Sequence, residues 1–488
     1  MKRLAVFAAL IICALVAAAQ QSTPPASAAP DAVSPPSPPA QVAPAPNPEF
    51  LQAADEVLEQ MSQILHLPIL DPLKKSLRSK QEIRDYLIRE ENDDKSDARR
   101  DADRKALEAF GLIPKDFPLD SFMLKVLTDQ VAGLYDPKGK EFYIADWIKP
   151  GEQREVMSHE LTHALEDQSF HIDSWIKAAR PNDDAETARD AVSEGTAMAA
   201  MVDYALRDDK VGVRELADIT PLMRNSALQQ MDEDPNLVKA PAYIRDGLLF
   251  PYLSGASFAQ QFLKAHSGWS DLHLIFENPP VSTQQIMHPD LYLKGVAPLK
   301  ITLPEWKGLV PSDWKLLEEN VMGEFGVEEI LKQLIGGVRA DALSPAWSGD
   351  RYAVFEDAKT RQNPDVLLLA LDTPEHTGRF FGQYSEGLET KYAARTDLFR
   401  RPNFFQFQTD QGGLFLYCVA LECLTVERAT RQTFDAIDRA IGWPAAPSPA
   451  EPPTSESAAR LVPTKSHVPA IRHARIPLDF FASFRKAG

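Results

Sequence analysis

The sequence predicts an α+β fold that is rich in helices. Helical patterns recur from about residue 50 to residue 335, and two β-rich runs flank a turn at residues 136–139. Residues 352–442 mix strand-like with helix-like runs. A chain of 488 residues exceeds one average domain, so we expect more than one folded unit.

The N-terminus has the layout of an export signal. Lys2 and Arg3 precede an apolar run over residues 4–19, which ends in small residues before Gln20. This order is typical of a cleaved secretory signal peptide, so we expect residues 1–19 to be removed and the protein to be secreted or periplasmic. No other run reaches 18 apolar residues, and we expect no transmembrane segment in the mature chain.

Composition argues against a nucleic-acid partner. The 70 Asp and Glu outnumber the 52 Lys and Arg, giving a formal net charge of -18, whereas phosphate binding needs a basic face. Proline gathers in residues 20–49 and again near the C-terminus, where we expect an extended linker and a disordered tail. The charged stretch of residues 89–105 is interpreted as a solvated helix face.

Two cysteines, Cys418 and Cys423, remain after signal removal. Export favours a disulfide between them. If both lie on one strand, however, their odd spacing turns them to opposite faces and they cannot bond. The pattern leaves this pairing open.

Residues 159–163 form the pattern His-Glu-x-x-His in a predicted helix that begins near Arg154. Residues four apart share one helix face, so the imidazoles of His159 and His163 can reach one metal ion. Glu160 adjoins the first histidine and can accept a proton from a metal-bound water. The pattern therefore predicts one Zn²⁺ ion, with Glu160 as general base.

A catalytic zinc takes a third protein ligand. The longer His-Glu-x-x-His-x-x-Gly-x-x-His pattern is absent, because Glu166 and Ser169 occupy its Gly and His positions. We therefore expect a carboxylate from the next predicted helix, which offers Glu186, Asp190 and Glu194. We prefer Glu194, since its small neighbours let two helices approach closely.

This arrangement resembles the gluzincin group of zinc metallopeptidases, in which a glutamate on a later helix completes the site. The resemblance implies a thermolysin-like, zincin-like catalytic domain with a small sheet, a His-Glu-x-x-His helix and a glutamate helix. It also implies hydrolysis of a peptide or protein substrate, with His159, His163 and Glu194 as metal ligands and Glu160 as base. Further pieces resemble poorly characterised exported bacterial proteins: AGLYDPKGKEFYI, HELTHALEDQ, SEGTA, FPYLSGASFAQQF, PPVSTQQIMHPDLYL and GDRY.

The chain departs from thermolysin-type enzymes in two ways. Glu194 follows His163 at a longer distance in sequence, and Met198 stands where those enzymes have an Asp that supports a ligand histidine. We expect Asp167 or Asp190 to give that support here.

Two further roles follow from the expected reaction. A hydrolase needs a donor for the developing oxyanion, for which His288 and Tyr252 are candidates, and we assign the catalytic role to His288. By the resemblance, residues 140–145 would form the edge strand that pairs with the substrate backbone. A further hypothesis makes residues 50–125 an inhibitory prodomain.

The leading hypothesis is an exported zinc metallopeptidase. The alternative is a non-catalytic periplasmic binding or envelope-associated protein on a zincin-like fold. An intact Glu160 favours the enzyme, because a structural zinc site does not need that carboxylate. The expected order is a signal peptide (1–19), a linker (20–49), a helical N-terminal segment (50–125), the catalytic domain (126–300), a helical connection (301–351), a smaller α+β domain (352–443) and a disordered tail (444–488).

Overall fold

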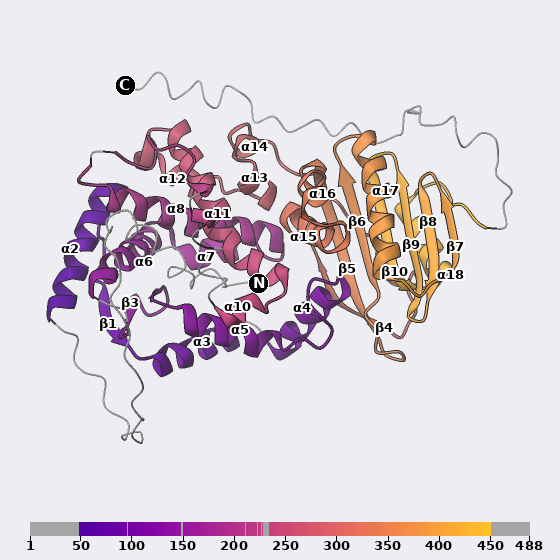
Figure 1. Cartoon of the computed structure of the whole chain (residues 1–488), viewed down its shortest axis with the longest axis horizontal. Helices are drawn as coiled ribbons and strands as arrows, with labels where there is room; N and C mark the ends of the chain where they lie inside the picture. Colours follow the sequence, from indigo (N-terminus) through magenta and orange to yellow (C-terminus); the bar gives the residue numbers. More distant parts are fainter. Residues whose placement is uncertain are drawn as a thin grey trace, which may run out of the picture. The chain divides into compact units, whose positions relative to one another are not determined.

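Figure 1 shows the computed structural model of the protein, which describes residues 48–449 except 95, 148–149, 210, 222, 226 and 228–233. The predicted signal peptide, the linker up to residue 47 and the tail from residue 450 lie outside the described residues. The predicted mixture of helices and strands is confirmed. Within the described part, no helix combines the length and apolar character needed to cross a membrane.

The described chain divides into two compact units, each built from separate stretches of sequence. The first contains residues 48–97, 118–179 and 186–279, and the second contains residues 98–117, 180–185 and 280–449. These units differ from the predicted contiguous domains. Segments far apart in sequence complete each unit, and a boundary drawn from local composition does not detect such pairing.

The first unit combines a small sheet with helices. Its elements are α2 (Pro48–Leu65), β1 (Lys74–Arg78), α3 (Lys80–Asp94), α5 (Leu119–Gln130), β2 (Gly133–Asp136), β3 (Glu141–Ala145), α6 (Pro150–Phe170), α7 (Ile172–Lys177), α8 (Asp183–Ala205), α10 (Pro235–Val238), α11 (Ala242–Ala265), η2 (Gly268–Asp271) and α12 (His273–Glu277). The start of α8 is grouped with the second unit.

The three-stranded sheet has the order β1-β3-β2. The predicted hairpin is present as β2 and β3, which pair antiparallel, while β1 pairs with β3 in parallel. The expectation that residues 140–145 form an edge strand is therefore wrong: β3 is central, and β2 and β1 are the edges. The sequence of β1 lacks the alternating apolar pattern that predicts a strand, so its pairing with β3 was not expected.

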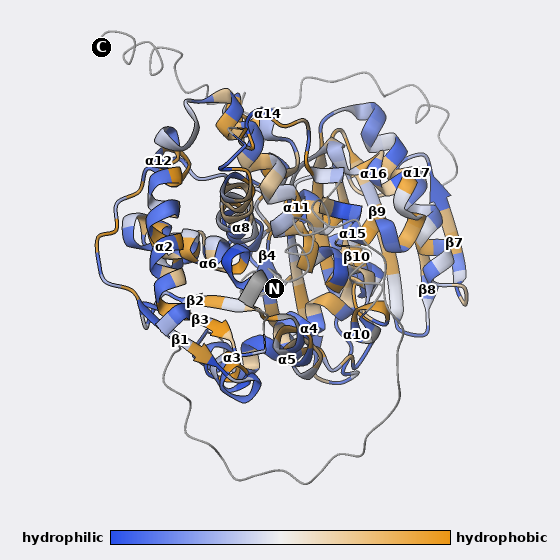
Figure 2. Ribbon diagram, turned by 60° about the vertical axis from the view of Figure 1, so that its left-hand side comes forward, coloured by the Kyte–Doolittle hydropathy of each residue, from blue (hydrophilic) through white to orange (hydrophobic). Residues whose placement is uncertain are grey.

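Helix α2 is built into the core of the first unit. Its buried residues recur every three or four positions and form one apolar face, which packs on α6. Figure 2 shows hydrophobic and hydrophilic residues alternating along this helix. Because α2 and β1 both contribute to this unit, the structure does not separate residues 50–125 from the predicted catalytic domain as an independent segment.

The second unit is built on a seven-stranded antiparallel sheet with the order β4-β5-β6-β10-β9-β8-β7. Its elements are α4 (Asp97–Ala109), α13 (Thr283–Met287), α14 (Pro289–Leu293), β4 (Trp314–Asn320), α15 (Gly323–Ile335), α16 (Gly337–Asp341), η3 (Ser344–Ala346), β5 (Trp347–Asp357), β6 (Asp365–Leu371), α17 (Pro374–Lys391), β7 (Thr396–Arg401), β8 (Phe404–Thr409), β9 (Gly412–Val419), β10 (Glu422–Ala429) and α18 (Arg431–Ile441).

Residues 301–351 differ from the predicted helical connection. They contain the edge strand β4 and the first residues of β5, as well as the helices α15 and α16. Only the second half of β4 is well buried, so its sequence shows little of the apolar alternation of a strand. Aromatic residues of the later strands, with Phe434 of α18, form a core on this sheet.

The charged stretch that was expected to be a solvated helix face has a structural role. In α4, Arg99 forms an ion pair with the buried Glu318 of β4 at 2.5 Å, and Lys105 pairs with Glu356 of β5 at 3.0 Å. The basic residues of α4 therefore bind carboxylates of the sheet.

The open question about the cysteines is settled by a hairpin. Cys418 at the end of β9 lies directly opposite Cys423 of β10, and the two form a disulfide. Ala420, in the turn between them, adopts the left-handed conformation with a φ of 55°. Because the chain reverses there, the two cysteines become cross-strand neighbours rather than residues on opposite faces of one strand.

Replacing Arg99 by Ala tests the pairing of α4 with the sheet. Glu318 would stay buried without its cation, so we expect the free energy of unfolding to fall by about 1–2 kcal/mol, a value reduced from that of a fully buried pair because Arg99 is one-third exposed. Urea unfolding followed by circular dichroism measures it. Lys125→Ala, which breaks a more exposed pair with Asp129, is the control and should cost less than about 0.5 kcal/mol. Equal losses of unfolding free energy in both variants would contradict a stabilising role for the Arg99–Glu318 ion pair.

Candidate metal centre

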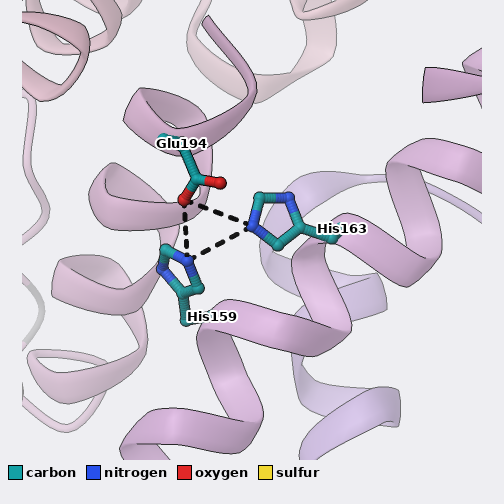
Figure 3. Close-up of side chains that lie close together, drawn as sticks. All are labelled: His159, His163 and Glu194. Carbon is teal, nitrogen blue, oxygen red and sulfur yellow. Dashed lines mark hydrogen bonds and ion pairs between the residues drawn. The ribbon is translucent and has the colours of Figure 1, made fainter. Parts of the chain in front are cut away.

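Three predicted ligands meet between α6 and α8 (Figure 3). His159 Nε2 lies 3.2 Å from Glu194 Oε2 and 3.2 Å from His163 Nε2, and His163 Nε2 lies 3.6 Å from the same carboxylate oxygen. All three side chains are buried. The group could hold a metal ion.

The donor set and spacing are compatible with a tetrahedral metal ion of the kind that zinc sites hold. Two imidazole nitrogens and one carboxylate oxygen are a common ligand set for such a site. Ligands about 2.0–2.1 Å from a tetrahedral ion lie roughly 3.3–3.5 Å from one another. The separations of 3.2, 3.2 and 3.6 Å are close to that range. The sequence preference for Glu194 over Glu186 and Asp190 agrees with this geometry.

The pKa values of the three side chains suit a site that holds a proton when no metal is bound. Burial lowers the pKa of His159 and so favours its neutral form. Burial opposes the charge of His163, but Glu194 outweighs it and raises the pKa of His163 to about 9. Burial likewise opposes the ionisation of Glu194, yet the His163 charge and the hydrogen bonds to both histidines lower its pKa. A metal bound here would displace the proton held by His163.

Glu160 lies beside this group on α6. Its side chain is buried, and its Oε2 has no hydrogen-bond partner among the described residues. Burial raises the pKa of Glu160 to about 8. Strand β2 passes close by at Gly133, where an added Cβ would lie 2.8 Å from Val156 Cγ1 and 3.3 Å from Glu160 Cγ. Glycine therefore lets the edge strand approach the candidate base.

Helix α8 packs closely on α11 beside the candidate ligands. A Cβ on Gly195 would lie 2.1 Å from the carbonyl of Gly255, and a Cβ on Gly255 would lie 2.1 Å from the oxygen of Ala191. The two backbones therefore touch at the residue after Glu194. Tyr252, one turn earlier on α11, stacks on the His159 ring with centroids 6.2 Å apart. This candidate oxyanion donor thus lies next to a ligand imidazole.

The support expected for a ligand histidine comes from a different residue. Asp167 accepts a hydrogen bond of 2.8 Å from the Tyr135 hydroxyl and forms an ion pair with Lys140, so it ties the β2–β3 hairpin to α6. The neighbour of His163 Nδ1 is instead Ser193 Oγ, at 3.3 Å. Sequence reasoning missed Ser193, because a serine inside an alanine-rich helix gives no signal of its own.

His288 lies in the second unit, between α13 and α14. Its Nε2 is 2.8 Å from Glu324 Oε1 of α15, and this hydrogen bond raises the pKa of His288. The structure thus supplies a partner that holds the imidazole. The catalytic role assigned to His288 stays a prediction.

Comparisons of the chain with protein-family models, curated proteins and solved structures find no match. Its function must therefore be inferred from its own residues and their geometry.

Replacing a ligand tests the metal centre. We expect the purified protein to hold about one Zn²⁺ per chain and the His163→Ala and Glu194→Ala variants to bind it roughly 100-fold more weakly or worse, since each loses a direct bond. Metal content and competition with a chromogenic chelator measure this. His273→Ala, an exposed histidine of the same unit, should bind as the parent does. Full occupancy in both ligand variants would refute the site.

Replacing Gly255 by Ala tests the helix crossing. The added methyl group would force α8 and α11 apart, so we expect the free energy of unfolding to fall by about 1–3 kcal/mol and Zn²⁺ affinity to fall with it. Gly382→Ala is the control, because an added Cβ in that part of α17 meets no atom within 4 Å and should stabilise the helix by up to about 1 kcal/mol. Unchanged Zn²⁺ affinity in the Gly255 variant would show that the crossing of α8 and α11 does not determine metal binding.

Proposed function

We propose that the protein is an exported zinc metallopeptidase of the gluzincin type that hydrolyses peptide bonds in a peptide or protein substrate. The observation that carries the proposal is the buried group of His159, His163 and Glu194 with Glu160 beside it. Zinc bound there would supply a Lewis acid that lowers the pKa of water and polarises a carbonyl. Three protein ligands leave one position for that water, as a catalytic site requires.

The side chains of Glu194, His159 and Ser193 would prepare the site to bind the ion. Glu194 brings one negative charge to the ion, and the neutral imidazole of His159 is favoured by its burial. Ser193 can accept a hydrogen bond from the Nδ1–H of His163 and so leave its Nε2 free to bind metal. This hydrogen bond orients the ring of His163, whereas the ring of His159 stacks on Tyr252.

Glu160 would act as the general base. It adjoins a ligand on the same helix turn, and its Oε2 is buried without a hydrogen-bond partner in the described part of the chain. A proton taken from water can therefore rest on this oxygen and pass to the leaving amine. Burial raises the pKa of Glu160 in the metal-free group, and a cation bound beside it would favour the ionised carboxylate that a base requires.

The alternative is a non-catalytic binding protein that uses the same fold. A purely structural zinc site is closed by four protein ligands and has no use for a buried carboxylate without a partner beside it. Glu160 therefore favours the enzyme. The disulfide between Cys418 and Cys423 supports export in either case, because such bonds persist in oxidising compartments.

Replacing Glu160 by Gln distinguishes a peptidase from a non-catalytic binding protein. We expect the variant to bind Zn²⁺ like the parent but to cleave a broad peptide library roughly 10²–10⁴-fold more slowly, since it lacks the base. Mass spectrometry of the library and metal content measure both properties. Glu59→Gln, an exposed residue of α2, should retain parental activity. A zinc-loaded parent that cleaves nothing in broad libraries would favour the binding protein.

A further inference from the structure

Arg189, on α8, is a half-buried cation that has no carboxylate partner in the described part of the chain. Its Nη1 donates a hydrogen bond to the backbone oxygen of Trp175 in α7. Its Nε is buried without a partner, and Nη2 has none among the described residues either. Burial lowers the pKa of Arg189, and no neighbouring carboxylate opposes that shift. The side chain therefore keeps a positive charge that the fold does not neutralise.

Aromatic residues of the first unit hold this guanidinium in place. Its Cζ lies 5.1 Å from the centroid of the Trp175 ring. Trp175 in turn donates from Nε1 to the backbone oxygen of Phe276 at 2.9 Å, and the centroids of the two rings are 4.9 Å apart. Phe276 stacks on Phe170, the last residue of α6, with centroids 4.1 Å apart. A cation fixed in this way gives up little conformational freedom when it binds a ligand.

Neither contact of Arg189 satisfies a guanidinium. A carbonyl oxygen and an aromatic face carry only partial negative charge, whereas the planar group of arginine has five N–H donors and binds a carboxylate more strongly. Two other arginines of the first unit do bind carboxylates: Arg78 lies 3.2 Å from Glu141, and Arg154 lies 2.6 Å from Glu56. Arg189 thus retains donors for an anion that the described chain does not supply.

Helix periodicity places Arg189 near the candidate metal centre. Ser193 follows it by four residues, so the two side chains leave the same face of α8, with Cβ atoms about 5–6 Å apart. Ser193 Oγ in turn lies 3.3 Å from Nδ1 of the candidate ligand His163. The Cβ of Arg189 is therefore on the order of 10 Å from the metal position, a distance that two or three residues of an extended peptide span.

We propose that Arg189 binds a carboxylate of the substrate two or three residues from the bond that is cleaved, and that it is thereby a specificity-determining residue. The carboxylate would receive a hydrogen bond from Nη2, and its second oxygen would lie toward the partnerless Nε. An acidic side chain and a free C-terminus both have this chemistry. The role in specificity rests on the proposed peptidase function, whereas the binding of a carboxylate at Arg189 does not.

Cleavage of matched peptides by the zinc-loaded protein tests the proposal. We expect the substrates found in a broad library to carry Asp, Glu or a free C-terminus two or three residues from the cleavage site. For the best substrate, replacing the acidic residue by its amide, or amidating the C-terminus, identifies which carboxylate is bound. In Arg189→Gln we expect kcat/KM for the carboxylate peptide to fall about 10–100-fold, to the value of the neutral peptide, because a charge-assisted hydrogen bond is lost.

Two further variants control for charge and for local packing. Arg189→Lys keeps the charge but not the planar group, so it should retain part of the preference. Arg207→Gln is the matched control: Arg207 donates to the Tyr204 oxygen at 2.6 Å and lies 4.3 Å over the Tyr204 ring, but it is exposed beyond the end of α8. This variant should keep parental selectivity. A parent that cleaves acidic and neutral peptides equally well, or an Arg189→Gln variant with the parental preference, would overturn the inference.

Chemical labelling of arginine side chains supplies a readout that needs no cleavage. We expect phenylglyoxal to modify Arg189, and N-acetylalanine to slow that reaction at concentrations where its uncharged amide does not, with no such difference at Arg207. Mass spectrometry of the digested protein measures each site. An Arg189 that is unreactive, or that both compounds affect equally, would contradict a carboxylate site. Selective protection of Arg189 in a zinc-loaded parent that cleaves no peptide would reject the peptidase and retain the carboxylate site.

Discussion

The contact on which the metal centre depends is the crossing of α8 and α11 at Gly195 and Gly255. No side chain separates the two backbones there, so the approach is set by backbone atoms and a single added methyl group cannot be accommodated. Glu194 is the neighbour of this contact in sequence, so its carboxylate projects from α8 beside the point where the two backbones touch. Tyr252, on α11, covers the His159 ring from the same helix pair.

This packing buries three carboxyl groups, and their ionised forms lose the hydration that water would give them. Glu160, Glu166 and Glu194 are all buried near two histidines, and burial raises the pKa of both Glu160 and Glu166 to about 8. Neither oxygen of Glu166 has a hydrogen-bond partner among the described residues. A dication at the centre would favour the ionised form of each carboxylate, so metal binding and folding stability should be coupled in this unit.

Local periodicity predicted the parts of the site that lie on one element. The spacing of His159 and His163 determines that they share a face, and a turn between two β-rich runs predicted the β2–β3 hairpin. Glu194 was preferred over Glu186 and Asp190 because its small neighbours favour a close helix crossing, and that crossing is present. The features that were missed depend on partners distant in sequence: β1 pairs with β3, the charged residues of α4 bind β4 and β5, and Asp167 binds the hairpin.

Contacts between residues distant in sequence also explain why neither unit is a continuous segment. Helix α8 is held by more than its crossing with α11, because Asp203 accepts hydrogen bonds from Trp269 Nε1 at 2.7 Å and from the Val213 N–H. The first turn of α8 is hydrogen-bonded to Asn320 of β4 and Thr283 of α13, and Gly323 leaves space for Asp184. The stretches around Thr283 and Asp350 therefore have a structural role in the second unit, where they hold the first turn of α8 and the turn at Gly323.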